Sequence, residues 1–479
     1  MSSLFQPAPL LRCTAGLRSR GLVPVAQHFQ RHASTSPAGI LVATGDSRTS
    51  TSAPVSRPAE ELPSGLERLP TSSVIRNILL GYFFSKPYLL KPGFAILRRI
   101  ADSRLQILNP DVNPILRRAL RPLLYDQFCA GTNKAEIGRT KDAIKGIGYS
   151  GIILCYGKET QFSEGLRNAN VSTAGHDSQI TQWRDGNLET LGMIGEGDWL
   201  GIKLTGAGSN VTAALMQNRA PCKEFLEATD AVCRKAAAQN CRIWIDAEQQ
   251  ALQSTIDLWT IQLMQRWNTN GKALVYNTVQ AYLKASRTKL KHQLALAQAG
   301  GWALGIKLVR GAYIGTDPRH LLHDTKQDTD DSYNSIVRDL LSGSNLGMRE
   351  QDFPKNVRLF LAGHNPDSVS AAWNLVQTLN EEGRLKVVPD FGQLQGMGDV
   401  LGCTFLQRRE SLASEAATGK DIIVPRLYKC LTWGSLHECM QYLFRRAVEN
   451  SGGVDRMRDG MVAYKAELRR RLFGSRSGA

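Results

Sequence analysis

Short apolar runs alternate with longer helical stretches from Tyr125 towards the end of the chain. Runs rich in β-branched residues occur at 152–155, 200–204, 242–247, 274–280, 304–309, 358–362, 386–389 and 422–425. The intervals between them are long enough for a crossover helix, and this alternation is typical of a parallel sheet covered by helices. Eight strands therefore predict an α/β fold built on a (β/α)8 barrel, with an open doubly wound sheet as the alternative.

Polar residues stand at or just after five of these runs. They are Lys203, Asp246, Glu248, Gln280, Arg310, Tyr313 and His364. In a barrel of this kind the chemistry sits at the carboxyl ends of the strands, so these side chains are expected to meet around one site. Each of them taken alone is better explained as a solvated loop residue or as a member of a structural ion pair.

The positive charge of the chain lies at its two ends. The formal net charge is +16, but residues 123–453 carry 36 Lys and Arg against 34 Asp and Glu. A groove for a nucleic-acid backbone needs basic residues on the folded body. The distribution therefore argues against a nucleic-acid enzyme, while a basic arm is left open.

The cysteine and histidine spacing supports neither a disulfide framework nor a metal site. Nine cysteines form an odd set without a C-x-x-C pair, which is typical of reduced thiols. The eight histidines show no H-E-x-x-H or H-x-x-E-H spacing. We therefore expect no bound metal ion.

Residues 1–45 have the composition of a mitochondrial transit peptide. They contain four arginines, several Ser and Thr, and no acidic residue before Asp46. A disordered basic terminus is the alternative interpretation. The segment 46–73 is rich in Ser, Thr and Pro, and we interpret it as a disordered linker because it is too polar to bury a core.

Apolar and basic residues are interleaved from 74 to 124. This segment is predicted to form a helical arm that either lies on an anionic membrane surface or packs on the main domain. Its apolar stretch at 78–84 is far shorter than the ~20 residues that span a bilayer. The main domain is expected at 125–453, followed by a basic helix or tail at 454–479.

Six motifs follow one another between residues 245 and 450. They are Ile245-Asp-Ala-Glu248, Val279-Gln-Ala-Tyr282, Gly305-Ile-Lys-Leu-Val-Arg-Gly-Ala-Tyr313, Ala362-Gly-His-Asn365, Phe391-Gly-Gln-Leu-Gln-Gly-Met397 and Tyr442-Leu-Phe-Arg-Arg-Ala-Val-Glu-Asn450. The ordered set resembles that of the mitochondrial proline dehydrogenase (proline oxidase) family, in a fungal-like form. The resemblance extends from about Tyr125 to Asn450.

The resemblance implies a distorted (β/α)8 barrel that holds FAD. In that family the flavin oxidises L-proline to 1-pyrroline-5-carboxylate and then reduces a membrane quinone. The partners it implies are therefore L-proline, ubiquinone and the matrix-side surface of the inner mitochondrial membrane, where the protein would be peripheral. It implies no nucleic acid.

The resemblance also implies which residues form the site. Those expected around the substrate are Lys203, Asp246, Tyr313, Leu394, Tyr442, Arg445, Arg446 and Glu449. Those expected at FAD are Gln280, Lys307, Arg310, Gly311, His364 and Asn365. Adjacent guanidinium groups can hold a carboxylate by charge-assisted hydrogen bonds, so Arg445 and Arg446 are assigned to the substrate carboxylate. Glu449 lies four residues after Arg445 and would orient it.

Three positions depart from the family's pattern. Gly363 replaces a threonine, and Cys430 falls where bacterial members have a tyrosine that lines the substrate pocket. Thr432-Trp433-Gly434 replaces Pro-Tyr-Gly or Pro-Val-Gly, and we expect Trp433 to reshape the pocket. Two other functions stay open: a hydroxyproline dehydrogenase, and a catalytically silent barrel whose arm tethers it to a membrane or to RNA.

Overall fold

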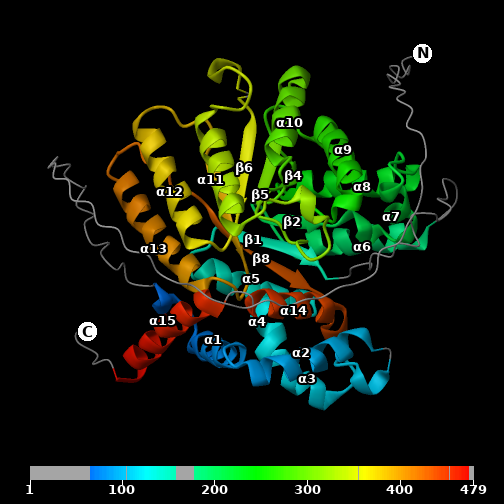
Figure 1. Ribbon diagram of the computed structural model, residues 1–479, viewed down its shortest axis with the longest axis vertical. Helices are drawn as coiled ribbons and strands as arrows, with labels where there is room; N and C mark the ends of the chain where they lie inside the picture. The colour runs from blue at the N-terminus through cyan, green and yellow to red at the C-terminus, as the bar shows by residue number, and fades with distance from the viewer. Residues whose placement is uncertain (1–64, 104, 158–176, 354, 452–453, 474–479) are drawn as a thin grey trace, which may run out of the picture. The chain divides into compact units, whose positions relative to one another are not determined.

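Eight parallel strands close into a barrel in which each strand pairs with its neighbours in chain order (Figure 1). They are β1 Gly151–Tyr156, β2 Trp199–Ile202, β3 Arg242–Ile245, β4 Val275–Gln280, β5 Leu304–Val309, β6 Val357–Ala362, β7 Pro389–Leu394 and β8 Leu427–Trp433. The sheet closes because β1 pairs with β8 as well as with β2. This confirms the predicted (β/α)8 barrel and excludes the doubly wound alternative.

This computed structural model describes residues 65–103, 105–157, 177–353, 355–451 and 454–473. The predicted transit peptide at 1–45 lies outside these residues. The predicted linker also lies outside them as far as residue 64.

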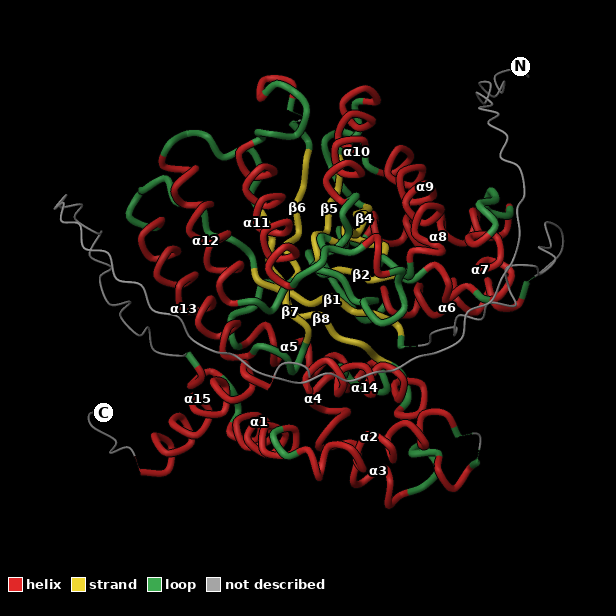
Figure 2. The backbone as a smooth tube through the Cα atoms, in the orientation of Figure 1, coloured by secondary structure: helices red, strands yellow, loops and turns green. Residues whose placement is uncertain are grey.

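Helices surround the strands on the outside of the barrel (Figure 2). They are α5 Lys134–Gly146, α6 Ser178–Leu191, α7 Ser209–Met216, α8 Lys223–Ala238, α9 Gln250–Trp267, α10 Ser286–Gly300, α11 Lys326–Ser342, α12 Pro366–Glu381, α13 Asp399–Ala416 and α14 Leu436–Ser451. Helix α5 precedes β1, helices α6 to α13 lie between consecutive strands as crossover helices of parallel pairs do, and α14 follows the last strand.

Two strands lie later in the chain than their apolar runs had indicated. The predicted positions 386–389 and 422–425 were wrong, because the strands lie at Pro389–Leu394 (β7) and Leu427–Trp433 (β8). Both strands contain charged residues that are buried with a partner. Asp390 of β7 pairs with two arginines, and Lys429 of β8 donates to Asp399 at 2.7 Å. Such pairing hides a buried strand from a search for apolar runs.

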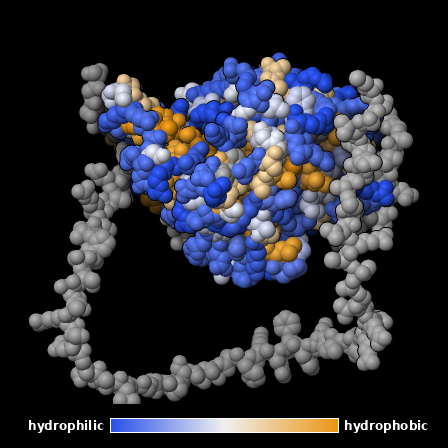
Figure 3. All heavy atoms as spheres, turned by 90° about the horizontal axis from the view of Figure 1, so that it is seen from above, coloured by the Kyte–Doolittle hydropathy of each residue, from blue (hydrophilic) through white to orange (hydrophobic). Residues whose placement is uncertain are grey.

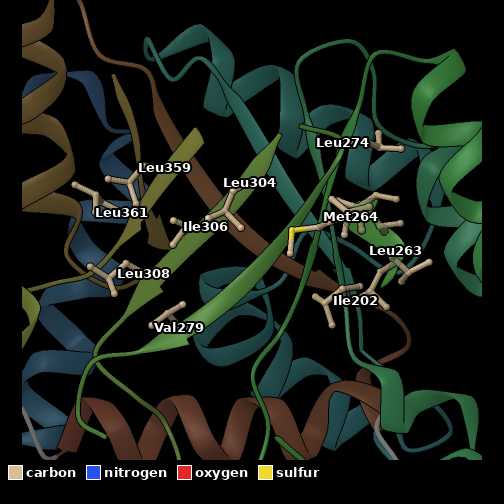
Figure 4. Close-up of a cluster of buried hydrophobic side chains, with 14 of the residues drawn as sticks. Ile202, Leu263, Met264, Leu274, Val279, Leu304, Ile306, Leu308, Leu359 and Leu361 are labelled. Atoms are coloured by element: carbon tan, nitrogen blue, oxygen red, sulfur yellow. The ribbon is translucent and has the colours of Figure 1, made fainter. Parts of the chain in front are cut away.

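Alternate strand residues face the helices and form the larger hydrophobic core. Figure 4 shows part of it, including Leu304, Ile306 and Leu308 of β5 with Leu359 and Leu361 of β6. Because side chains alternate along a strand, the residues between these leucines and isoleucines face the barrel interior. The charged Lys307 is one of them, and it lines the cavity described below.

The amino-terminal half of the barrel interior is filled by an aromatic layer. Its members are Trp199, Trp244, Tyr276, Phe360 and Tyr428, which form one buried cluster with Ile153. The ring centroid of Trp199 lies between 4.7 and 6.0 Å from those of the other four, a range that favours tilted and edge-to-face packing. The layer therefore closes the barrel at this end.

The N-terminal arm is helical and packs on α14. It comprises α1 Thr71–Phe84, α2 Pro87–Asp102, α3 Pro114–Leu120, a π-helical turn at Arg121–Tyr125 and α4 Asp126–Phe128. Leu80, Phe84 and Ile100 of the arm are buried in one cluster with Leu436 and Met440 of α14. Of the two arrangements expected for the arm, the structure shows the one in which it packs on the main domain.

The described end of the predicted linker, residues 65–73, is helical in part and not disordered. Leu66 begins a single 3-10 turn and is fully buried, as Leu69 nearly is. Arg471 of α15 (Val454–Phe473) donates to the carbonyl oxygens of Leu66 at 3.0 Å and Leu69 at 2.8 Å. Both leucines are buried in a cluster with Cys403 and Tyr464, residues distant in the sequence, so the local composition did not indicate their burial. The arm therefore begins earlier than residue 74.

The surface in Figure 3 is largely hydrophilic, with separate hydrophobic patches. Four arm residues between α2 and α3, or at the start of α3, are more than half exposed; they are Leu105, Ile107, Val112 and Ile115. Within the described ranges, no helix combines the length and the apolar content that crossing a membrane requires.

Candidate active site

A cavity of about 400 Å³ lies at the carboxyl ends of the strands, above the aromatic layer. Its lining includes Lys203, Asp246, Gln280, Lys307, Arg310, Gly311, Tyr313, His364, Asn365, Leu394, Tyr442, Arg445 and Arg446. Apart from Glu248 and Glu449, every site residue predicted from the sequence therefore lies around one cavity. Glu449 belongs to α14, but its side chain is outside the described part of the structure.

Helix α14 brings a tyrosine and two arginines to the cavity. Tyr442, Arg445 and Arg446 are spaced by three and four residues, so they share a face of the helix. The Arg446 Cζ atom lies 5.3 Å from the centroid of the Tyr442 ring, within cation–π range. Burial raises the pKa of Tyr442, so its hydroxyl stays protonated at neutral pH. The two guanidinium groups make this side of the cavity suitable for an anion.

A lysine and a carboxylate meet deeper in the cavity. Lys307 Nζ donates to Asp246 Oδ1 at 2.5 Å and lies 3.7 Å from the centroid of the Trp244 ring. Strand β5 directs Lys307 inward, and Asp246 directly follows β3. A buried ion pair is tolerated when both charges are compensated, and the aromatic face adds to this compensation. The pair thus holds Asp246 in place.

The guanidinium of Arg310 lies between α11 and α12. Its Nε donates to Asp330 Oδ1 at 2.8 Å, and its Nη2 donates to Ser368 Oγ at 2.6 Å. Its third nitrogen, Nη1, is buried and has no hydrogen-bond partner among the described residues. Buried donors are nearly always paired, so an unpaired one on a cavity residue points to an acceptor supplied by a ligand.

Gln280 ends β4 and is 3% exposed. Its Nε2 donates to the carbonyl oxygen of Glu248 at 3.4 Å. The Glu248 carboxylate accepts from Thr205 Oγ1 at 2.6 Å and from Thr205 N at 3.2 Å. Glu248, one of the polar residues noted at the strand ends, therefore ties β2, β3 and β4 together behind the cavity wall.

The end of β6 meets the start of α12. Asn365 caps this helix, because its Oδ1 accepts from Ser368 N at 3.1 Å. His364 Nε2 accepts from Leu394 N at 3.3 Å, so Nδ1 carries the proton of the neutral ring. The positive end of a helix dipole and a ring N–H together favour a bound anion here.

Two cysteines form a contact that the sequence did not reveal. Cys155 of β1 and Cys430 of β8 both line the cavity, and their Sγ atoms lie 3.9 Å apart. The contact with Cys430, followed by burial, raises the pKa of the Cys155 thiol. Alternation along β1 was the available signal, since Cys155 shares the inward side with Ile153 of the aromatic cluster.

Trp433 lies behind the cavity wall. Its indole Nε1 donates to Thr190 Oγ1 of α6 at 2.8 Å, so the side chain faces the helices. Cys430 and Thr432 are the β8 residues that line the cavity. The expectation that Trp433 reshapes the pocket was therefore wrong, because alternation along β8 directs it outward.

The wall near Arg310 fits a phosphate-bearing group. It combines the unpaired Nη1 of Arg310, the N-terminus of α12 and the nearby Lys326. A β-carbon at Gly363 would lie 3.6 Å from Arg310 Nη1, so glycine leaves the space beside this donor open. The described ranges contain no group of three or more His, Cys, Asp or Glu placed to hold a metal ion.

Comparison with known proteins gives matches over the same region. Residues 155–459 match the sequence pattern of the family described as proline dehydrogenase. The chain is 31% identical over 262 residues to a probable mitochondrial proline dehydrogenase of Schizosaccharomyces pombe, covering 52% of this chain and 51% of that protein. It is 32% identical over 251 residues to the hydroxyproline dehydrogenase of Bos taurus, covering 51% and 50%. The match thus spans about half the length of these curated relatives.

Solved structures share the fold. The proline utilization A (PutA) structure from Bdellovibrio bacteriovorus inactivated by N-propargylglycine has a TM-score of 0.59 and 14% identity, covering 84% of this chain and 43% of that chain. A PutA variant from Bradyrhizobium japonicum has a TM-score of 0.51 and 18% identity, covering 85% and 43%. At such identities the likeness shows the barrel fold alone.

Proposed function

This chain belongs to the proline dehydrogenase family, and on that premise we propose that it catalyses the FAD-dependent oxidation of L-proline to 1-pyrroline-5-carboxylate. The observation that carries the proposal is the pair Arg445 and Arg446, which α14 presents to the cavity at the carboxyl ends of the strands. A small zwitterionic substrate needs such a pair to fix its carboxylate.

The substrate residues have distinct tasks. Arg445 and Arg446 bind the carboxylate by charge-assisted hydrogen bonds, and Lys203 adds a third positive charge to the same cavity. Tyr313, Leu394 and Tyr442 surround the apolar ring methylenes. Asp246 is held by Lys307 and completes the polar side of the site. These contacts fix the ring in one orientation, which is the main contribution of positioning to catalysis.

FAD, when bound, supplies the two-electron acceptor that no side chain provides. Gln280 and Lys307 are assigned to the flavin ring system. Arg310, Gly311, His364 and Asn365 are assigned to the diphosphate and ribityl part, where the unpaired Arg310 Nη1 and the α12 N-terminus support them. Cations preorganised in this way stabilise negative charge without reorganising during the reaction.

We also propose that the protein works at the matrix face of the inner mitochondrial membrane, with ubiquinone as the electron acceptor. Several relatives are named as mitochondrial. The exposed Ile107 precedes α3, which carries the exposed Ile115 together with Arg117 and Arg118, and this combination of apolar and basic residues suits an anionic lipid surface. The arm buries other side chains, such as Phe84 and Ile100, against α14, while Ile107 and Ile115 are exposed.

An anaerobic visible spectrum of the purified full-length protein, taken before and after addition of L-proline, tests the proposal. We expect a flavin spectrum that L-proline bleaches. A flavin spectrum unchanged by L-proline would reject proline as the substrate. A colourless folded protein would reject the flavoenzyme and support the silent membrane or RNA tether.

Hydroxyproline is the second candidate substrate, because the hydroxyproline dehydrogenase of Bos taurus is among the relatives. The ratio of kcat/KM for L-proline and trans-4-hydroxy-L-proline decides between them. A ratio above one supports the proposal, and a ratio below one supports the alternative.

A further inference from the structure

Arg310 is held from three directions by residues of two helices. Asp330 accepts from Nε and Ser368 accepts from Nη2, as described above. The ring of Tyr333 covers the guanidinium plane, with Cζ 4.6 Å from the ring centroid. Asp330 and Tyr333 are three residues apart on α11 and so share one face of that helix.

Asp330 differs from an ordinary surface partner of an arginine. Its side chain is 10% exposed, and its second oxygen accepts from Lys326 Nζ at 2.6 Å. Burial alone would raise the pKa of Asp330, but the hydrogen bonds from Lys326 and Arg310 lower it below its ordinary value. The residue is therefore an anion at neutral pH and serves two cations of the same cavity wall.

The three contacts leave one nitrogen of the guanidinium unpaired. With Nε and Nη2 each bonded and one face covered by Tyr333, Nη1 is the buried guanidinium nitrogen left without a partner among the described residues. This nitrogen lies beside Gly363, where no side chain competes for it. A buried donor without a partner is costly, so the arrangement is explained only if a ligand acceptor completes it.

We propose that Asp330 is a positioning residue for the cofactor, which together with Ser368 fixes the Arg310 guanidinium so that Nη1 meets the bound FAD. This inference rests on the proposed FAD-dependent function. It concerns Asp330 of α11 and Ser368 of α12, neither of which lines the cavity. Without Asp330 the guanidinium can rotate, and the donor that faces the cavity is lost for part of the time.

The test is the affinity of the full-length chain for FAD, measured by quenching of flavin fluorescence after removal of the bound cofactor. We expect Asp330→Asn to raise the Kd of FAD about tenfold, because hydrogen bonds between charged groups are among the stronger ones. Ser368→Ala is expected to raise it about threefold.

A double-mutant cycle separates positioning from general damage to the fold. In an Arg310→Met background, Asp330→Asn should change the Kd by less than about twofold. Asp331→Asn is the matched control. Asp331 is exposed on the same helix, and its carboxylate accepts a hydrogen bond from Gln327 of that helix and not from Arg310.

Three outcomes would overturn the inference. They are an equal effect of Asp330→Asn with and without Arg310, an equal effect of Asp331→Asn, and normal FAD affinity in both Asp330→Asn and Ser368→Ala. If Asp330→Asn does not fold, the Ser368→Ala result decides. Failure of the wild-type chain to bind FAD would overturn the proposed function itself, which distinguishes the two.

Discussion

Lys429 and Asp399 form a buried ion pair between strand β8 and helix α13, with 2.7 Å between Nζ and Oδ1. Their side chains are 3% and 9% exposed. Burial lowers the pKa of Lys429, but the Asp399 carboxylate raises it above its ordinary value, so the lysine stays charged. The pair belongs to the support of the barrel and not to the cavity.

Removal of the lysine alone should be costly. We expect Lys429→Met to lower the free energy of unfolding by about 3–5 kcal/mol, because Asp399 is left buried without compensation. Adding Asp399→Leu should recover part of the loss. Urea denaturation measures both, with Lys420→Met as the exposed control at under about 1 kcal/mol. A Lys429→Met variant as stable as the wild type would contradict the expectation.

Arg445→Met should weaken substrate binding. The loss of one charge-assisted hydrogen bond is worth roughly 1.5–3 kcal/mol, which corresponds to a rise of about 10- to 150-fold in KM for L-proline. Steady-state kinetics of the flavin-loaded enzyme measure this rise. Arg384→Met, at a side chain that is 60% exposed, is the control. An unchanged KM would remove Arg445 from the substrate site.

The Cys155 thiol should react slowly at neutral pH. Because the pKa of Cys155 is raised, its reactive thiolate is scarce, and alkylation should accelerate about tenfold per pH unit from pH 7 to pH 9. Saturating L-proline should slow labelling of Cys155 and Cys430, as measured by mass spectrometry of the peptides. Cys222, outside the cavity lining, is the internal control. Absence of protection would place the substrate elsewhere.

The exposed apolar residues of the arm should be needed on membranes but not for folding. Ile107 and Ile115 are 71% and 78% exposed, and burial of each side chain in lipid contributes roughly 1.5–3 kcal/mol. We expect the Ile107→Glu, Ile115→Glu double variant to lose at least tenfold in binding to anionic vesicles, with Tm unchanged. Val388→Glu, 48% exposed and outside the arm, is the control. If the double variant sediments with vesicles as well as the wild type does, Ile107 and Ile115 do not form the surface that binds lipid.

Glu467 should make the attachment of α15 sensitive to acid. Arg470 and Arg471 donate to its carboxylate, and the hydrogen bond from Arg470 is the main cause of its lowered pKa. Because the pKa of Glu467 is lower in the folded than in the unfolded state, the ionised carboxylate stabilises the protein at a pH above its ordinary pKa of 4.5. This contribution disappears as the pH falls through the lowered pKa of the folded state. The difference in Tm between wild type and Glu467→Gln should therefore shrink from pH 6 to pH 3. A constant difference would contradict this linkage.

The predictable part of the fold was the part with plain apolar runs. Strand β5 lies at the residues predicted, because Leu304, Ile306 and Leu308 alternate with residues that are also mostly apolar. Strands β7 and β8 could not be placed, because Asp390 and Lys429 are acceptable in a buried strand only through partners distant in the sequence. No local pattern contains those partners.

The site shows the same division. The cavity residues at strand ends, such as Lys203 and Gln280, could be predicted because the barrel brings all eight carboxyl ends together. Asp330 and Ser368 could not, since they stand 20 and 58 residues from Arg310 and meet it only where two helices pack. The sequence thus indicates which residues can take part in the chemistry better than which residues hold them in place.

The aromatic layer leaves the barrel open at one end only. Trp244 and Phe360 line the inner end of the cavity, and the rest of the layer fills the space below them. Substrate and electron acceptor would therefore both approach the cavity from the carboxyl ends of the strands. Under the proposed function, a flavin bound there would hold the two electrons between the reaction with L-proline and the reaction with the acceptor.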